Sequence, residues 1–261
     1  MSVDTREATK GRLIPFSWER VPWWAIILGI VGITVGWAVL TSEAYLNVIR
    51  FVTDGIQLTL QVTFISYLIG LVLGLIFGLM RVSDNPILYA ASTLYVEVMR
   101  GIPLLVIILY MGFVLTPMLR NATNGQINIQ GLPSAILGLA VGYGAYMAEV
   151  YRSGIESIER GQMEAARSLG MNYMQAMRYV ILPQAIRRIL PPLGNNFISM
   201  LKDSSLIAVI ALPDLLQMGR LYVSRTFRAF EGYNTVALLY LVMTLFLSLI
   251  VRIIERKAAI E

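Results

Sequence analysis

The sequence predicts an all-α integral membrane protein, on the grounds of its composition and the lengths of its apolar segments. Hydrophobic residues make up 57% of the 261 residues, charged residues only 14%, and the mean hydropathy is +0.68. Soluble domains carry about 25% charged residues, so the charged side chains here are too few to cover a soluble globule. A helix needs ~20 apolar residues to cross a hydrocarbon core, and about six such segments are expected, at 23–40, 55–80, 101–119, 132–148, 192–212 and 233–251.

The composition also excludes several kinds of site. The chain contains no cysteine and no histidine, which removes zinc and iron–sulfur sites, a thiol nucleophile and a histidine base. No Gly-Lys dipeptide occurs, so a Walker A phosphate loop is excluded. We therefore expect no catalytic site, metal or bound cofactor in this chain. The net charge of +5 is typical of basic cytoplasmic loops in a membrane protein rather than of nucleic-acid binding.

The first apolar segment, 23–40, is uncharged and follows a polar stretch, 1–22, that contains several Lys and Arg residues. Trp23 and Trp24 stand at its start, where interfacial aromatic residues are common. A signal peptide is disfavoured, because the apolar run exceeds the usual length of roughly 7–15 residues and no Ala-x-Ala cleavage site follows. We expect an additional, uncleaved membrane helix at 23–40 after a cytoplasmic segment at 1–22.

The second segment, 55–80, has small residues at a regular spacing. Gly70, Gly74 and Gly78 recur every four positions, which places them on one helical face. Another helix can approach such a face closely. The alternative is that glycine is simply frequent in membrane helices.

Charged residues flank or interrupt the later segments, and a polar insertion at 149–192 has helical periodicity. The charged positions are Glu97 and Arg100 before 101–119, Glu149 and Arg152 after 132–148, and Lys202 and Asp203 within 192–212.

The distribution of Lys and Arg predicts the orientation in the membrane. With the N-terminus inside, 16 of the 21 Lys and Arg residues fall on the inner side and 5 on the outer side, as the positive-inside rule requires. We therefore expect both termini and 149–192 in the cytoplasm. Arg120 is one of the five residues on the outer side. Three more arginines lie in the single outer loop 213–232, and topology does not explain why they gather there.

Residues 162–169 predict a short helix. Glu164 lies in its first turn, where an acidic side chain suits the helix dipole. Gly170 follows, and glycine readily takes the left-handed conformation beyond a helix end. Ala165 and Ala166 keep one side of this helix thin enough to fit a groove on another protein.

A second short helix is expected directly after the first. Asn172 is suited to cap it, and it would run from Tyr173 to about Leu182, with Pro183 closing it. The two helices together form a rigid elbow that projects from the membrane.

The elbow resembles the signature of the membrane subunits of ABC importers, which is Glu-Ala-Ala, three residues, Gly, nine residues, a branched aliphatic residue, any residue and Leu-Pro. In this chain it reads Glu164-Ala165-Ala166, Gly170, Val180 and Leu182-Pro183, with Val where Ile is usual. Flanking blocks narrow the resemblance to the polar amino acid permeases; they lie at 95–105, 148–155, 191–196 and 201–206. The resemblance covers about residues 50–258.

The resemblance implies a type I importer core of five membrane helices within 50–258, in a bacterial cytoplasmic (inner) membrane. It implies a second permease subunit, identical or related, an external amino acid-binding protein, and two ATPase subunits that dock on the coupling loop 152–192. Those ATPase subunits would bind ATP and Mg²⁺. The residues implied in coupling are Glu164, Ala165, Ala166, Gly170, Leu182 and Pro183.

Ionisable groups within a membrane cost ~2.5–3.5 kcal/mol on insertion scales, so each needs a partner or a purpose. Glu97 and Arg100 lie three positions apart and can pair on one helical face. They either anchor the cytoplasmic end of a helix or lie on the substrate path. Glu149 and Arg152 have the same spacing, and we expect them to orient the elbow.

A polar stripe is expected in the segment 192–212. Asn195, Ser199 and Lys202 follow the i, i+4, i+7 pattern, and Asn196 and Asp203 lie beside them. Such a stripe offers donors and acceptors to a zwitterionic amino acid. A polar seam between subunits is the competing interpretation.

The function expected from these residues is that of a permease subunit in an ATP-driven, binding-protein-dependent amino acid importer. An ATP-independent secondary carrier or channel for small polar solutes would need no elbow, and carriers often contain internal repeats, which this sequence does not show. An assembly scaffold would need no polar groups within its spans. The sequence leaves open which amino acid is carried and whether the pore is a homodimer or a heterodimer.

Overall fold

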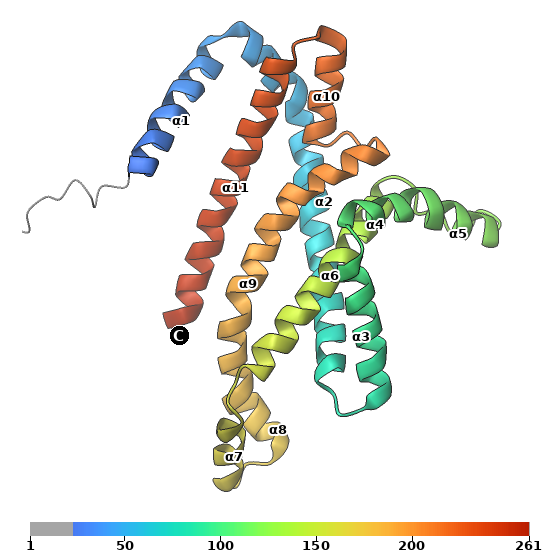
Figure 1. Cartoon of the computed structure of the whole chain (residues 1–261), viewed down its shortest axis with the longest axis vertical. Coiled ribbons are helices and arrows are strands. Elements are labelled where there is room, and N and C mark those ends of the chain that lie inside the picture. Colours follow the sequence, from blue (N-terminus) through green and yellow to red (C-terminus); the bar gives the residue numbers. More distant parts are fainter. Residues whose placement is uncertain (1–22, 261) are drawn as a thin grey trace, which may run out of the picture. The chain divides into compact units, whose positions relative to one another are not determined.

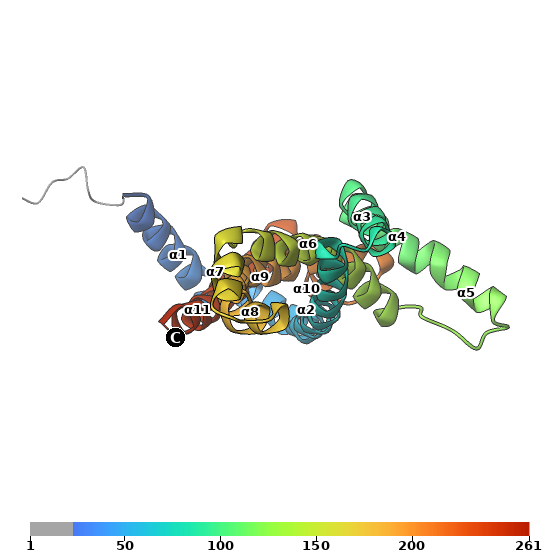
Figure 2. The same ribbon diagram turned by 90° about the horizontal axis from the view of Figure 1, so that it is seen from below.

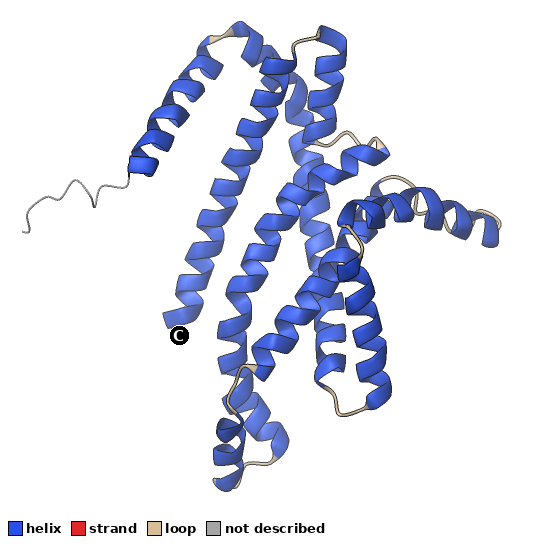
Figure 3. Cartoon of the chain, in the orientation of Figure 1, coloured by secondary structure: helices blue, strands red, loops and turns tan. Residues whose placement is uncertain are grey.

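The computed structural model of the chain describes residues 23–260, and every regular element among them is a helix (Figure 3). The prediction of an all-α protein is thereby confirmed. The expected cytoplasmic segment 1–22 lies outside the described residues. The chain divides into two compact units, one ending at Leu46 and one beginning at Asn47.

The helices follow one another with short connections (Figure 1). In chain order they are α1 (Trp23–Thr41), α2 (Glu43–Val82), α3 (Pro86–Gly101), α4 (Leu104–Tyr110), the π turn η2 (Met111–Leu115), α5 (Thr116–Ala122), α6 (Leu132–Glu156), α7 (Arg160–Ser168), α8 (Tyr173–Ala176), the π turn η3 (Met177–Ile181), α9 (Leu182–Asp203), the 3₁₀ helix η4 (Ser204–Ile210), α10 (Leu215–Thr226) and α11 (Ala229–Ile260).

In the first unit, α1 is a helix of 19 residues without a charged side chain. Ile27, Ile33 and Trp37 are exposed on it. This length and composition suit a hydrocarbon environment. The membrane position of 23–40 stays a prediction.

In the second unit, α6 is the central helix and packs against α3, α4 and α9 (Figures 1 and 2). Its buried side chains are mostly small. A Cβ added at Gly138 would lie 3.2 Å from the Ile108 Cα atom of α4, so α4 approaches the backbone of α6 closely. A helix enclosed in this way meets other helices rather than lipid, and it tolerates glycine and serine for that reason.

The small-residue face of α2 packs on α6, as the glycine spacing predicts. A Cβ at Gly74 would lie 2.5 Å from the Met147 Cβ atom, and a Cβ at Gly78 would lie 2.8 Å from the Tyr151 Cβ atom. Neither position leaves room for a side chain. The interpretation as a contact face is confirmed over the alternative that these glycines are incidental.

Length and apolar composition allow three described segments to cross a membrane, namely Glu43–Val82, Leu104–Ala122 and Ala229–Arg256. Tyr173–Ile210 passes the same test together with Leu215–Thr226, from which it is bent by 49°. These segments overlap four of the expected spans, 55–80, 101–119, 192–212 and 233–251, and the total of about six stays a prediction.

Some segment boundaries differ from those expected. The third span begins at Leu104 rather than at 101, because Pro103 occupies the N-cap position of α4. The charged positions Glu97 and Arg100 lie before this break, on the separate helix α3. The fifth segment also begins earlier than expected, because α9 starts at Leu182.

Candidate coupling elbow and charged network

The first helix of the expected elbow is α7, and it ends as the sequence predicts. Gly170 has a φ of +87°, in the left-handed region that glycine adopts without strain. Its N–H donates to the Arg167 carbonyl at 3.0 Å, and the Met171 N–H donates to the Ala166 carbonyl at 3.3 Å. These two bonds form a Schellman motif, so Gly170 sets the direction in which the chain leaves α7.

The second helix begins with a reciprocal cap. The Gln175 N–H donates to Asn172 Oδ1 at 2.9 Å, and the Asn172 N–H donates to Gln175 Oε1 at 2.9 Å. The cap at Asn172 is therefore confirmed, and Gln175 completes a capping box. The spacing Asn-x-x-Gln is the sequence signal that identifies Gln175.

Pro183 does not end the second helix, and that prediction is wrong. Pro183 lies in the first turn of α9, which continues without a break to Asp203. The π turn η3 precedes it, and the Leu182 N–H donates to the Met177 carbonyl five residues back. This wider turn accommodates a proline, which has no N–H and would otherwise clash with the preceding turn. As a result the elbow is continuous with α9.

The tip of the elbow exposes side chains on both sides of Gly170. Glu164 and Ala165 are exposed, whereas Ala166 is 4% accessible and packs inside the elbow. Leu169 is 83% exposed and Met174 is 70% exposed. Sequence reasoning missed these two apolar residues, although Leu169 directly precedes Gly170 and Met174 lies four positions after it. Leu182 and Pro183 are exposed at the start of α9.

Hydrogen bonds attach the elbow to the helices on either side. The Nη1 atom of Arg188 donates a hydrogen bond to the carbonyl of Ser157, which lies in the connection between α6 and α7. Gln184 Nε2 donates to the Val180 carbonyl at 2.8 Å and to Gln162 Oε1 at 3.5 Å. The bond between Gln184 and Gln162 links α9 to α7.

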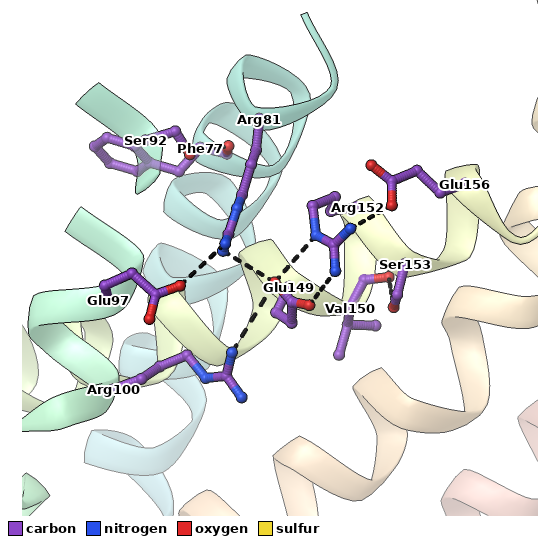
Figure 4. A network of polar contacts seen from close by, with 10 residues as sticks. All are labelled: Phe77, Arg81, Ser92, Glu97, Arg100, Glu149, Val150, Arg152, Ser153 and Glu156. Carbon is purple, nitrogen blue, oxygen red and sulfur yellow. Dashed lines mark hydrogen bonds and ion pairs between the residues drawn. The ribbon is translucent and has the colours of Figure 1, made fainter. Parts of the chain in front are cut away.

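A network of six charged side chains joins α2, α3 and α6 (Figure 4). Arg81 Nη1 lies 3.0 Å from Glu149 Oε2, and Arg81 Nη2 lies 3.0 Å from Glu97 Oε1. Glu149 also binds Arg152 and lies 4.0 Å from Arg100. The network ends on α6, where Arg152 pairs with Glu156.

The network corrects one pairing and confirms another. Glu97 and Arg100 do not pair with each other; Glu97 binds Arg81, and Arg100 faces Glu149. The Glu149–Arg152 pair is present as predicted. Sequence reasoning did not identify Arg81 as part of this network, because its partners are distant in the chain.

Three arginines and three glutamates make the network electrically neutral. The Arg152 hydrogen bond lowers the pKa of Glu149, which lies one residue beyond the expected span 132–148, and the nearby Arg81 and Arg100 act in the same direction. The Glu149 carboxyl is therefore held in its charged form by its arginine neighbours. Among the described residues no cluster of acidic side chains could hold a metal ion. The ion pairs connect three helices, an arrangement that suits a clamp between them.

A family model for the inner membrane component of binding-protein-dependent transport systems matches residues 70–260. The chain belongs to this family. It is therefore a permease subunit of an ABC transport system, as the Glu-Ala-Ala resemblance predicts.

Named relatives and solved structures agree with this assignment. The probable amino-acid ABC transporter permease YckA of Bacillus subtilis is 40% identical over 211 residues, covering 80% of this chain and 89% of YckA. The glutamine transport permease GlnP of Escherichia coli K12 is 37% identical over 212 residues, and the match covers 81% of this chain and 94% of GlnP.

Among solved structures, an amino acid ABC transporter crystallised with histidines matches with a TM-score of 0.71 and 40% identity, covering 80% of this permease and 94% of that chain. The inward-facing methionine transporter MetNI matches with a TM-score of 0.68 and 27% identity, and the match covers 84% of this permease and 99% of that chain.

The polar stripe of the permease lies on the C-terminal half of α9. Asn195 and Lys202 are exposed and Ser199 is half-buried, and none of their side chains has a hydrogen-bond partner in the described part of the chain. Asp203 differs, because it accepts a hydrogen bond from the Tyr143 hydroxyl of α6 at 2.7 Å. Asn196 Nδ2 is buried without a partner. The stripe is therefore open to a substrate or to a second subunit, while Asp203 fixes α9 to α6.

Proposed function

We propose that this chain is the membrane-spanning permease of an importer that carries amino acids from an external binding protein into the cell. Family membership supports the importer class, and the names of YckA and of the transporter crystallised with histidines support amino acids as cargo. No observation favours an ATP-independent carrier or channel.

The observation that carries the proposal is the continuity of the elbow with α9. An exposed, rigid tip at Glu164, Ala165 and Leu169 offers a surface to a partner. The Schellman turn at Gly170 and the capping box then lead into a helix that reaches Asp203. A force applied at α7 would pass through the Gly170 turn and along α9 to the polar stripe.

In this mechanism two ATPase subunits bind ATP and Mg²⁺ and seat on the elbows of two permeases, identical or related. Their closure moves α7 and α9 together and shifts the membrane helices between inward-facing and outward-facing states. Glu164 and Ala165 form the exposed face of the docking helix, and Ala166 packs behind it inside the elbow. Gly170 sets the angle of this helix, and Leu182 with Pro183 joins it to α9. Glu97 and Arg100, with Arg81, Glu149 and Arg152, hold α2, α3 and α6 in register.

The same proposal places the protein in a bacterial cytoplasmic membrane as a multi-pass subunit with both termini in the cytoplasm. The importer core corresponds to residues 50–258 with the coupling loop 152–192, and 23–40 is an additional membrane helix. Asn195, Asn196, Ser199, Lys202 and Asp203 line the substrate path or form a seam with the second subunit. A reporter fused after Glu261 should behave as cytoplasmic.

The decisive experiment reconstitutes the permease with its ATPase and binding protein and compares Gly170→Val with Gly170→Asn. A non-glycine residue in the left-handed conformation costs roughly 1–2 kcal/mol, which asparagine largely avoids, so we expect about a tenfold loss of uptake and of substrate-stimulated ATPase activity for valine only. Normal values for both activities in the valine variant would contradict the coupling role.

A second measurement tests the docking surface directly. The chain contains no cysteine, so Ala165→Cys introduces a single thiol in the exposed part of α7. We expect a crosslink from position 165 to the ATPase in the intact complex, whereas Ser224→Cys on α10 serves as a control that should give none. A crosslink from position 224 alone would exclude the elbow as the docking site.

A further inference from the structure

A cavity of about 450 Å³ lies where η2 and α5 meet η4 and the connection before α6. Figure 1 shows α5 projecting from the bundle on the side away from α11, and it lies far from the elbow formed by α7 and α8. The wall residues that bear on its chemistry are Phe113, Thr116, Arg120, Asn121, Gln130 and Ile210. Neither the polar stripe nor the charged network contributes to this wall.

Three polar side chains of the cavity have no partner in the described chain. The guanidinium of Arg120 makes no ion pair there, and the side-chain amides of Asn121 and Gln130 make no hydrogen bond. The Thr116 hydroxyl already has a hydrogen-bond partner, because it donates to the Met111 carbonyl at 2.7 Å across the π turn. One cation and two amides are therefore free to bind a ligand.

The chemistry of these groups favours a carboxylate. A guanidinium binds a carboxylate through two parallel N–H donors, and amide N–H groups supply further donors. Phe113 and Ile210 give the same cavity apolar walls, and a site with apolar walls and a few convergent polar groups is typical for a small molecule. The volume suits a molecule the size of an amino acid.

The position of the cavity connects it with transport. Ile210 ends η4, and η4 begins one residue after Asp203 at the end of the polar stripe. One wall residue, Ile210, thus lies on the same continuous stretch of chain as the stripe. Arg120 is one of the residues that the charge distribution assigns to the outer side of the membrane.

We propose that this cavity is an entry subsite that holds the carboxylate of the cargo through Arg120, Asn121 and Gln130 before the cargo reaches the polar stripe. The inference rests on the proposed function of an amino acid importer. A carboxylate is also present on acidic side chains of a binding protein, and a lipid phosphate is a further anion, so the experiment separates these sources.

The first test measures uptake of an equimolar mixture of the twenty standard L-amino acids by cells that express the whole importer. We expect Arg120→Gln to lower uptake about tenfold, as loss of a charge-assisted pair predicts, and Arg120→Lys to lower it less. Arg228→Gln is the matched control, since Arg228 is exposed at the turn between α10 and α11. Co-purification of the ATPase should be unchanged in every variant.

The second test measures binding at the cavity itself, in the purified complex in nanodiscs. Pro117 lines the cavity, so Pro117→Cys places a single thiol there and keeps the three polar groups. We expect the amino acid mixture to slow maleimide labelling at least threefold, and the mixture of their α-amides, which lack the carboxylate, to have no effect. The protection should disappear when Arg120→Gln is added.

Other outcomes overturn the subsite. Protection that needs the binding protein and ignores free amino acids would assign the cavity to protein docking. Protection by anionic phospholipid alone would assign it to a lipid headgroup. Unchanged uptake in Arg120→Gln, with ATP-dependent uptake intact in the unmodified importer, would overturn the subsite only, whereas ATP-independent uptake by the unmodified importer would overturn the proposed function.

Discussion

Arg81 and Glu149 are 68 positions apart in the chain, yet the Arg81 Nη1 atom lies 3.0 Å from Glu149 Oε2 (Figure 4). The Arg81 side chain is only 13% accessible, so water screens this pair weakly. The pair connects the end of α2 to the part of α6 that leads into the elbow. Each partner also binds a second charged group, Glu97 for Arg81 and Arg152 for Glu149.

Removing Arg81 should therefore destabilise the helix bundle. Arg81→Met leaves Glu97 without its partner and takes one donor from Glu149, and charge-assisted hydrogen bonds of this kind are worth about 1–3 kcal/mol. We expect a loss of that size in the free energy of unfolding, measured by urea titration in detergent. Arg187→Met, at an exposed arginine without an ion pair, should change it little. Equal losses in the two variants would show that the network adds no stability.

The contribution of Glu149 should depend on pH in one direction. Its pKa is lowered in the folded protein, first by the Arg152 hydrogen bond, so its stabilisation is present above the ordinary pKa of 4.5 and is lost as pH falls through the folded pKa. The difference in thermal midpoint between the unmodified protein and Glu149→Gln should be constant from pH 7 to about 5.5 and should shrink in more acidic buffer. A difference that grows on acidification would contradict this assignment.

Features that depend on neighbours in the chain could be predicted from the sequence. Gly170 ends α7 in the left-handed conformation, and Asn172 caps the next helix. The glycine spacing in α2 identified the face that packs on α6. In each case the cause lies within one or two helical turns, where residue type and spacing determine the geometry.

Features that depend on distant contacts could not be predicted in this way. The i, i+3 rule pairs Glu97 with Arg100, but the folded chain offers Glu97 the guanidinium of Arg81 from another helix. Pro183 predicts a helix end, but the π turn η3 accommodates it and α9 continues. The cavity at Arg120 also depends on the approach of η4 to η2, where a Cβ at Gly112 would lie 3.1 Å from the Ile210 Cγ2 atom, and no local pattern indicates it.

Two glycines on the same face of α2 should respond differently to alanine. A Cβ at Gly70 meets its nearest atom, Met147 Sδ, at 3.4 Å, which is ordinary contact, whereas a Cβ at Gly74 lies 2.5 Å from the Met147 Cβ atom. Gly70→Ala should be neutral or stabilise by up to about 1 kcal/mol through helix propensity. Gly74→Ala should destabilise by about 1–3 kcal/mol, because the two helices must separate. Thermal unfolding in detergent distinguishes the two, and a neutral Gly74→Ala would mean that α2 does not pack on α6 in this register.

The cap at Asn172 should stabilise the start of the second elbow helix. Asn172→Ala removes the acceptor for the Gln175 N–H, and loss of such a cap costs about 0.5–2 kcal/mol. Aspartate caps helices about as well as asparagine, so Asn172→Asp is the matched control. We expect faster hydrogen exchange at 173–181 in the alanine variant, with exchange in α6 unchanged, because the cap is local. Equal exchange in the alanine and aspartate variants would show that packing against α7, rather than the cap, holds the elbow in place.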